Sequence, residues 1–285
     1  MSQTITPELR RWLQEQAAAG YSRQSVLEAL LKAGWQPALA ATALASEWDT
    51  HQRDPASEVA AASPPPSQRL PDLDLSRSPR QIDAGDRWVD VIATLAKPRV
   101  VVLGQLLSAE ECDALVAAAR PRLARSLTVQ TQTGGEELNP DRTSEGMFFR
   151  RGETELIARI EARIARLVNW PVDHGEGMQV LHYGTGAQYK PHYDYFDPAQ
   201  PGTASILRRG GQRVATLVMY LSEPARGGGT TFPDAGLEVA PVRGNAVFFS
   251  YDRPHPATGT LHGGAPVVDG EKWVATKWLR ERVFE

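Results

Sequence analysis

Two runs of sequence are the most informative for structure and function. They are QVLHYGTGAQYKPHYDYF at residues 179–196 and LHGGAPVVDGEKWVATKWLRER at residues 261–282. The first run contains His192 and Asp194, separated by one residue. In an extended strand the side chains alternate between two faces, so residues i and i+2 point the same way. We therefore expect His192 and Asp194 to converge on one site while Tyr193 points elsewhere. The alternative for such a pair is a hydrogen-bonded pair on the surface.

A metal site built on this pair needs a third ligand from a distant strand. Of the six histidines, His255 and His262 follow the apolar segment 245–250. His255 lies between two prolines, which stiffen the backbone, whereas His262 precedes two glycines that allow a close backbone approach. This reasoning favours His262 and leaves the choice open. Two imidazoles and one carboxylate form the ligand set that holds Fe(II) and leaves coordination positions free.

Lys272 lies ten residues after His262. Most lysines are solvated on the surface, so only this offset distinguishes Lys272 from an ordinary surface residue. A lysine at a fixed distance from the last ligand can bind the far carboxylate of a dicarboxylic cosubstrate. Together with the two histidines and the aspartate, it indicates an iron- and 2-oxoglutarate-dependent oxygenase.

The two runs resemble the catalytic domain of the prolyl 4-hydroxylase family, the collagen-type branch of the 2-oxoglutarate oxygenases. In that family the second ligand histidine opens an H-A-G-C-P-V-like stretch, and the lysine follows in a G-x-K-W stretch. The resemblance covers about residues 98–282, with Ala265 in place of the family cysteine. The matching segments are His262-Gly-Gly-Ala-Pro-Val, Gly270-Glu-Lys-Trp, Arg142-Thr-Ser, Gly227-Gly-Gly-Thr-Thr-Phe-Pro and Lys277-Trp-Leu-Arg.

The resemblance implies His192, Asp194 and His262 as iron ligands. The family pattern Tyr-x-x-Gly-x-x-Tyr-x-x-His-x-Asp also places Tyr183 and Tyr189 in the pocket, with Tyr183 the better candidate to hydrogen-bond 2-oxoglutarate. Even spacing puts further residues on a shared strand face. We expect Thr216 and Tyr220 to line the cosubstrate tunnel with Lys272, and Trp278 to share the face of Lys272. For each aromatic residue the alternative is ordinary core packing.

The implied reaction is hydroxylation of a C–H bond, with peptidyl proline as the substrate that the family suggests. The expected cofactors are Fe(II), 2-oxoglutarate and O2, and ascorbate is included on the same resemblance. The expected partner is a peptide or protein substrate, selected by the loops 131–144 and 195–213. The alternatives are hydroxylation of another peptide residue or of a free amino acid, and a binding module without turnover.

The order of elements predicts the fold class. Helical segments precede many short β-rich runs, which are separated by turns rich in glycine and proline. Segment 157–167 carries isoleucine and leucine at helical spacing, a face suited to packing on a sheet. This order favours an α+β, mainly β domain in which helices cover one face of a sandwich. The resemblance makes it a double-stranded β-helix, or jelly roll, preceded by a small helical module.

We divide the 285 residues into three parts. Residues 1–48 are expected to form a three-helix module that loosely resembles the ubiquitin-associated fold and that can bind a protein partner. Residues 49–85 are rich in proline, serine and alanine, a composition typical of a flexible linker. Residues 86–285 are expected to form the dioxygenase domain, with its core at 174–282.

Composition and charge limit the partners, the disulfide bonds and the cellular location that we expect. The formal net charge of −3 gives no reason to expect nucleic acid or an anionic membrane as a partner. The one cysteine, Cys112, excludes an internal disulfide framework, and its place in the amphipathic segment 108–119 predicts a core position. The N-terminal residues have no apolar stretch typical of a signal peptide. A cytoplasmic protein is therefore the simplest expectation.

Overall fold

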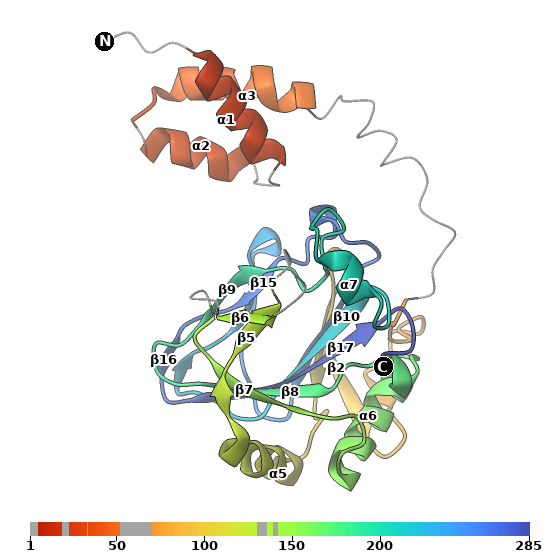
Figure 1. Ribbon diagram of the computed structural model, residues 1–285. Helices are drawn as coiled ribbons and strands as arrows, with labels where there is room; N and C mark the ends of the chain where they lie inside the picture. The colour runs from red at the N-terminus through yellow and green to blue at the C-terminus, as the bar shows by residue number, and fades with distance from the viewer. Residues whose placement is uncertain (1–4, 19–22, 33, 52–69, 130–135, 139–141) are drawn as a thin grey trace. The chain divides into compact units, whose positions relative to one another are not determined.

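A computed structural model describes residues 5–18, 23–32, 34–51, 70–129, 136–138 and 142–285. The chain divides into two compact units, Met1–Gln68 and Arg69–Glu285. Figure 1 shows helices in the first unit and mainly strands in the second. Among the described residues, no helix combines the length and the apolar character that a membrane span requires.

Within its described residues, the first unit contains three helices around a small core of its own. Gly34 follows the second helix with a φ of 85°, and the Trp35 N–H donates to the Leu30 carbonyl, a common way to end a helix. Pro37 begins the third helix, as its fixed φ favours. The helices are α1 (Pro7–Ala18), α2 (Arg23–Lys32) and α3 (Pro37–His51). Their buried residues are Leu9, Leu13, Val26, Leu30, Ala40, Ala43 and Leu44.

A nine-stranded antiparallel sheet is the main structural element of the second unit. Its strand order is β1-β2-β3-β14-β10-β17-β8-β7-β4. Strand β17, which lies within residues 261–282, is therefore placed between β10 and β8. The strands are β1 (Gln81–Asp83), β2 (Trp88–Leu95), β3 (Arg99–Gly104), β4 (Ala124–Arg125), β7 (Glu145–Phe149), β8 (Met178–Tyr183), β10 (Arg213–Tyr220), β14 (Ala246–Ser250) and β17 (Lys272–Arg280).

A smaller sheet faces the large one. Its order is β13-β12-β15-β9, and a cluster of buried side chains that includes Phe232, Tyr220 and Val274 joins residues of both sheets. Its strands are β9 (Tyr189–His192), β12 (Thr230–Phe232), β13 (Leu237–Val239) and β15 (His262–Gly264). Two further strand pairs are β11 (Arg226–Gly227) with β16 (Val267–Asp269), and β5 (Leu127–Val129) with β6 (Glu136–Leu138). The two facing sheets confirm the expected jelly-roll arrangement.

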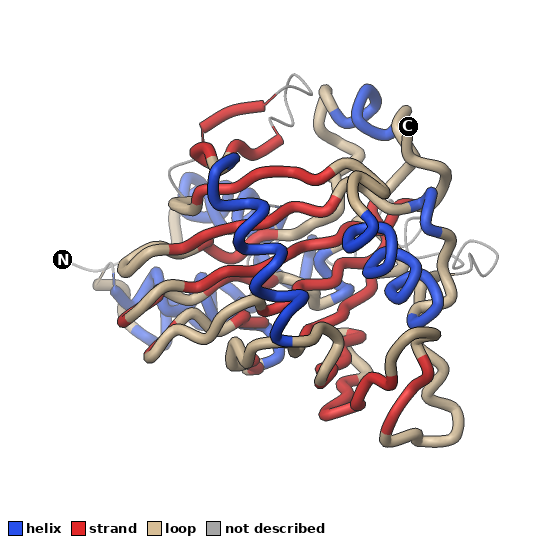
Figure 2. The backbone as a smooth tube through the Cα atoms, turned by 90° about the horizontal axis from the view of Figure 1, so that it is seen from below, coloured by secondary structure: helices blue, strands red, loops and turns tan. Residues whose placement is uncertain are grey.

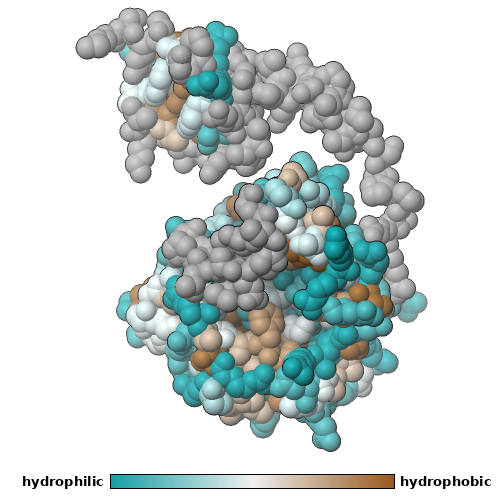
Figure 3. Space-filling view, in the orientation of Figure 1, coloured by the Kyte–Doolittle hydropathy of each residue, from teal (hydrophilic) through white to brown (hydrophobic). Residues whose placement is uncertain are grey.

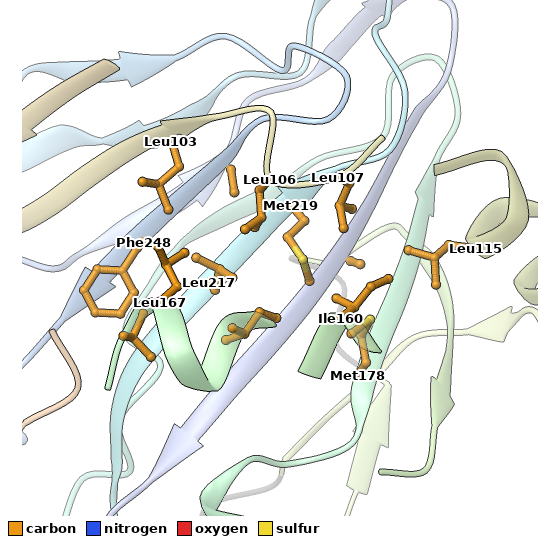
Figure 4. Packing of buried hydrophobic residues seen from close by; sticks show 14 of the residues in the cluster. Leu103, Leu106, Leu107, Leu115, Ile160, Leu167, Met178, Leu217, Met219 and Phe248 are labelled. Carbon is orange, nitrogen blue, oxygen red and sulfur yellow. The ribbon is translucent and has the colours of Figure 1, made fainter. Parts of the chain in front are cut away.

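Helices cover the opposite face of the large sheet (Figure 2). Along β14, Phe248 packs toward the helices while Val247 and Phe249 pack toward the small sheet, which is the alternation that a strand imposes. Figure 4 shows Leu217 and Met219 of β10 beside Ile160 and Leu167 of α6. The helical elements are α5 (Ala109–Ala119), α6 (Glu155–Leu167), α7 (Thr203–Leu207), η1 (Arg120–Arg122), η2 (Val172–His174), η3 (Pro233–Ala235) and η4 (Pro256–Thr258).

Two expectations about this layer agree with the structure. The α6 stripe of Ile157, Ile160, Ile164 and Leu167 is buried, because the helix presents one apolar face to the sheet. Cys112 is fully buried in α5, and burial raises the pKa of its thiol. The cysteine therefore has the core position that the sequence predicts.

The expected linker, residues 49–85, overlaps both units. Helix α3 continues to His51, beyond the predicted end of the module at residue 48. Leu73 and Ala84 are buried in the core of the second unit, and β1 pairs with β2. The second compact unit thus begins at Arg69, before the expected boundary at residue 86, because a few leucines in a polar segment are enough to anchor it to a sheet. Residues 52–69, which include the three consecutive prolines, lie outside the described residues.

We predict that a chain starting at Arg69 unfolds at the same temperature as the second unit of the full protein. A chain starting at Asp86 should be less stable, because it lacks strand β1 and the buried Leu73. Burial of one leucine side chain alone contributes about 1.5–3 kcal/mol. Urea unfolding of both truncated proteins measures the difference. Equal free energies of unfolding would show that residues 69–85 do not belong to the unit.

Candidate active site

Two neighbouring strands of the small sheet bring the predicted histidines together. His192 ends β9, His262 begins β15, and the two residues are direct partners in the antiparallel pair. Asp194 lies two residues beyond the end of β9. The Nε2 atoms of His192 and His262 each lie 3.5 Å from an oxygen of the Asp194 carboxylate. One candidate ligand atom from each residue lies within 4.8 Å of the others. The structure thus brings the predicted triad into one cluster.

Backbone carbonyls orient both imidazoles. The Nδ1 atom of His192 lies 2.9 Å from the Lys190 carbonyl, and that of His262 lies 2.9 Å from the Thr260 carbonyl. A carbonyl only accepts hydrogen bonds, so each Nδ1 carries the proton and each Nε2 keeps its lone pair for a metal. Burial lowers the pKa of His262 to about 4, against the opposing effect of Asp194. His262 is therefore neutral at pH 7, the form in which an imidazole binds a metal.

The glycine after His262 is required by the approach of the two strands. A Cβ atom on Gly263 would lie 2.9 Å from the Tyr189 carbonyl oxygen and 3.1 Å from the Pro191 nitrogen. Any larger residue would push β15 away from β9 and separate the two histidines. This contact gives a physical reason for the glycine that follows the ligand.

A residue of the large sheet holds the Asp194 carboxylate. Thr216 Oγ1 donates a 2.6 Å hydrogen bond to Asp194 Oδ2, and the Tyr251 hydroxyl lies 3.1 Å from Thr216 Oγ1. Because the threonine proton is given to the carboxylate, Tyr251 donates to the threonine. Burial opposes ionisation of Asp194, but His262 and His192 outweigh it and hold the pKa well below its usual range. The carboxylate is therefore ionised and fixed in orientation.

Lys272, the first residue of β17, lies in the same pocket as the triad. Its side chain is buried, and Nζ lies 5.5 Å from the ring centre of Tyr183 and 5.8 Å from that of Tyr220. Burial lowers the lysine pKa to about 8. Within the described part of the chain, Lys272 forms no ion pair. A buried charge without a partner is unfavourable, so this position is suited to an anionic ligand.

One pocket contains eight of the nine predicted site residues. Tyr220 is the exception. Its ring centre lies 5.8 Å from Lys272 Nζ, and its hydroxyl donates to Thr230 Oγ1 at 2.8 Å. Thr216 lines the pocket but its hydroxyl is directed at Asp194 rather than at free space. The lining residues are Arg142, Leu181, Tyr183, Tyr189, His192, Asp194, Thr216, Val218, Thr230, His262, Gly263, Gly264, Lys272, Val274, Thr276 and Trp278.

His255, the alternative that the sequence left open, lies elsewhere, and so does His182. His255 is exposed, and its Nδ1 accepts a hydrogen bond from the Ala257 N–H in a short turn. His182 pairs with Glu271 at 2.9 Å near the surface. Neither residue lines the pocket. The choice of His262 over His255 therefore has a geometric basis.

Three residues of the site were not predicted from the sequence. Arg142 is buried, stacks on the Tyr189 ring with 4.9 Å to the ring centre, and donates to Gln179 Oε1. Thr230 and Tyr251 act through hydrogen bonds to Tyr220 and Thr216. The sequence held a signal for Arg142, since it begins one of the segments that resemble the family. Tyr251 could have been placed by the alternation of β14, because it follows Phe249 at even spacing.

The donor set fits an Fe(II) ion. Two imidazole lone pairs and one ionised carboxylate oxygen converge on one point, which is the three-ligand arrangement of non-haem iron oxygenases. The residues on the other side of the site are also fixed. The Arg213 guanidinium lies 4.1 Å from the Trp278 ring centre and binds Glu176 at 2.6 and 3.0 Å.

This chain is similar to a known family and to several known proteins. The sequence profile of the 2OG-Fe(II) oxygenase superfamily matches residues 178–280. Prolyl 4-hydroxylase 5 of Arabidopsis thaliana is 41% identical over 223 residues, covering 70% of this chain and 74% of that protein. Prolyl 4-hydroxylase 1 of the same plant is 42% identical over 203 residues, covering 65% of this chain and 70% of that protein. The viral collagen prolyl hydroxylase vCPH from Paramecium bursaria Chlorella virus-1, solved with 2OG, is 31% identical with a TM-score of 0.48 and covers 64% of this chain and 95% of that one.

We predict that Thr216→Val weakens metal binding, because Asp194 Oδ2 then loses its buried hydrogen-bond donor. Loss of such a supporting residue typically lowers metal affinity by about 10–100-fold. Calorimetric titration with Mn(II) or, without oxygen, with Fe(II) measures the dissociation constant. Thr185→Val is the matched control, since it removes an exposed hydroxyl bond to the Gly270 carbonyl. Equal affinities in both variants would exclude a role of Thr216 in holding the ligand.

Proposed function

Because this chain belongs to the prolyl 4-hydroxylase family of 2OG-Fe(II) oxygenases, we propose that it hydroxylates prolyl residues in a peptide or protein. It is a dioxygenase that depends on Fe(II) and 2-oxoglutarate. One observation carries the proposal. The triad of His192, Asp194 and His262 lies in the same pocket as Lys272, a buried cation that forms no ion pair in the described part of the chain.

The side chains that hold the cofactors follow from the geometry. His192 Nε2, His262 Nε2 and an oxygen of Asp194 would bind the iron. Lys272 would pair with the far carboxylate of 2-oxoglutarate through a charge-assisted hydrogen bond. When bound, these groups supply the activation of O2, in which 2-oxoglutarate is converted to succinate and CO2 while one oxygen atom enters a substrate C–H bond.

The walls of the pocket support this role. Leu181, Val218 and Val274 line it with apolar side chains that exclude water from the cosubstrate. Burial raises the pKa of Tyr183, so its phenol stays protonated and can donate a hydrogen bond to the cosubstrate. The apolar lining strengthens the electrostatic contact of Lys272, because exclusion of water lowers the local dielectric constant.

Aromatic residues suit a prolyl ring. Tyr189 and Trp278 both line the pocket; the Tyr189 ring contacts His192, with ring centres 3.7 Å apart, and the Arg142 guanidinium, so Trp278 is the ring that can contact a substrate. A flat aromatic face packs well against the apolar pyrrolidine ring and so can hold the ring beside the iron ligands. The Arabidopsis relatives are prolyl 4-hydroxylases, which supports the same substrate class here.

Three finer expectations stay predictions. Ascorbate as an accessory cofactor rests on the family resemblance, and a cytoplasmic location rests on the low cysteine content. A protein partner for the helical unit rests on its having a separate core, Leu13 and Leu44 included.

The proposal is tested with the full chain, Fe(II), 2-oxoglutarate and peptides that contain a single proline. Mass spectrometry should show a gain of 16 Da on that proline, with one succinate formed per hydroxyproline. Asp194→Ala should form neither product. Succinate formation coupled to a modified residue other than proline would contradict the substrate assignment, and turnover in Asp194→Ala would contradict the site.

We predict that Lys272→Ala raises the KM for 2-oxoglutarate. A hydrogen bond between charged groups contributes about 1.5–3 kcal/mol, which corresponds to about a ten- to hundredfold change in affinity. Steady-state succinate formation at varied 2-oxoglutarate gives the value. Lys97→Ala is the control, because Lys97 is exposed and lies outside the pocket. A KM like that of the unchanged protein would mean that another residue binds the carboxylate.

A pH dependence follows from the lysine pKa of about 8. Burial lowers this pKa, so Lys272 loses its proton as the pH rises through 8, whereas an exposed lysine would keep it. The KM for 2-oxoglutarate should therefore rise above pH 8 and be nearly constant below it. In Lys272→Arg the guanidinium stays charged, so the slope above pH 8 should disappear whatever the absolute KM. An equal slope in the two proteins would assign the titration to another group.

A further inference from the structure

A second cavity, of about 810 Å³, adjoins the pocket and is strongly basic. We call it the arginine groove. The anionic groups that line it are the side chains of Glu176 and Glu285 and the main-chain carboxylate of Glu285, so the formal charge is five positive and three negative, or +2. The whole chain has a formal net charge of −3. Positive charge is thus concentrated at this place. Its basic residues are Arg150, Arg151, Arg209, Arg213 and Arg280.

The buried end of the arginine groove has more cations than anions. Glu176 Oε1 lies 2.6 Å from Arg213 Nε and 2.7 Å from Arg280 Nε, so one carboxylate serves two guanidinium groups. Burial lowers the pKa of Arg280 to about 10, with Glu176 opposing this effect and Arg213 adding to it. One positive charge at this end therefore has no counter-charge among the groove residues, and the carboxylate of Asp194 in the pocket is the other anion that acts on Arg213.

The open end is neutralised only in part. Arg151 Nη1 donates to the carbonyl oxygens of Asp173, Gly175 and Phe284, which are neutral acceptors and do not offset its charge. Arg209 Nε donates to the main-chain carboxylate of Glu285 at 2.7 Å. Among the described residues, no side-chain ion pair involves Arg150, Arg151 or Arg209. Figure 3 shows hydrophilic residues beside α7, the helix that precedes Arg209.

The arginine groove continues from the catalytic pocket. Arg213 lies in the groove, stacks on Trp278 of the pocket, and donates to the Asp194 carbonyl at 3.3 Å. Phe148, half exposed, also lines the groove, and its ring centre lies 6.4 Å from that of Trp278. An extended peptide with a residue at Trp278 would therefore pass Phe148 and enter the groove.

We propose that the arginine groove binds the carboxylate of an aspartate or glutamate that flanks the target proline in the substrate. The proposal rests on the proposed function and names a finer substrate class, acidic prolyl peptides. Guanidinium groups bind carboxylates through paired N–H donors in a fixed geometry, which gives position as well as affinity. The exposed Arg150 and Arg209 make the first contact, and the excess charge at Arg213 and Arg280 attracts the carboxylate inward.

Peptide pairs test the idea with the full chain. Each pair contains one proline and differs by glutamate or glutamine at a single flanking position. At one position or more, the glutamate peptide should have a KM lower by about fivefold at unchanged kcat, the effect of about 1 kcal/mol for a partly exposed ion pair. The difference should shrink as the ionic strength rises, because salt screens exposed charges.

Two variants and a control locate the effect. Arg150→Gln and Arg209→Gln should each reduce the preference for glutamate while leaving turnover of the glutamine peptide unchanged. Arg208→Gln is the matched control, since Arg208 is exposed next to Arg209 and does not line the groove. A preference that is lost equally in the control would overturn the assignment to this groove.

Two results would separate this proposal from the proposed function. Equal KM values for glutamate and glutamine at every position, with proline still hydroxylated, would overturn the acidic subsite alone. If no peptide is hydroxylated, the proposed function fails, and fluorescence anisotropy of the same labelled pairs decides the groove. Tighter binding of the glutamate peptide, reduced in Arg209→Gln, would then support the subsite, and equal binding would overturn it.

Discussion

The carboxylate of Asp194 is the group on which the site depends. It is buried, it is ionised, and it contacts both sheets of the sandwich. Two histidines of the small sheet lie on one side, and the Thr216 hydroxyl of the large sheet holds Oδ2 on the other. An ionised carboxylate in the interior is unfavourable without such partners. The packing of the two sheets against each other therefore sets the ligand geometry, and the ligands need not be rearranged to bind a metal.

The charged residues around the carboxylate differ in how they are compensated. Arg213 is held by Glu176, which it shares with Arg280, and by the Trp278 ring. Lys272 has two aromatic rings and no ion pair among the described residues, and its pKa falls from 10.5 to about 8. This shift corresponds to roughly 3 kcal/mol against the charged form. An incoming dicarboxylate offsets that cost, so the pocket favours an anion of this kind.

The sequence predicted the parts of the site that lie on single strands. The i, i+2 spacing of His192 and Asp194 and the even spacing of Lys272 and Trp278 follow from strand geometry, and α6 followed from its apolar stripe. Contacts across the sandwich could not be predicted in this way. Alternation shows that Thr216 faces inward, but it does not show that Asp194 is its partner, or that Tyr220 lies beneath Lys272 with its hydroxyl on Thr230. Composition likewise missed Leu73, because one anchoring leucine hardly changes the average of a polar segment.

The central claim is that His192, Asp194 and His262 hold one ion beside Lys272. The most direct measurement is a crystal structure with Mn(II) and 2-oxoglutarate in which anomalous scattering locates the metal. We expect one anomalous peak between the two Nε2 atoms and an Asp194 oxygen. Thr216 should still be bonded to Oδ2, and the far carboxylate of 2-oxoglutarate should lie at Lys272. A peak at His255 or at the His182–Glu271 pair, with none at the triad, would contradict it.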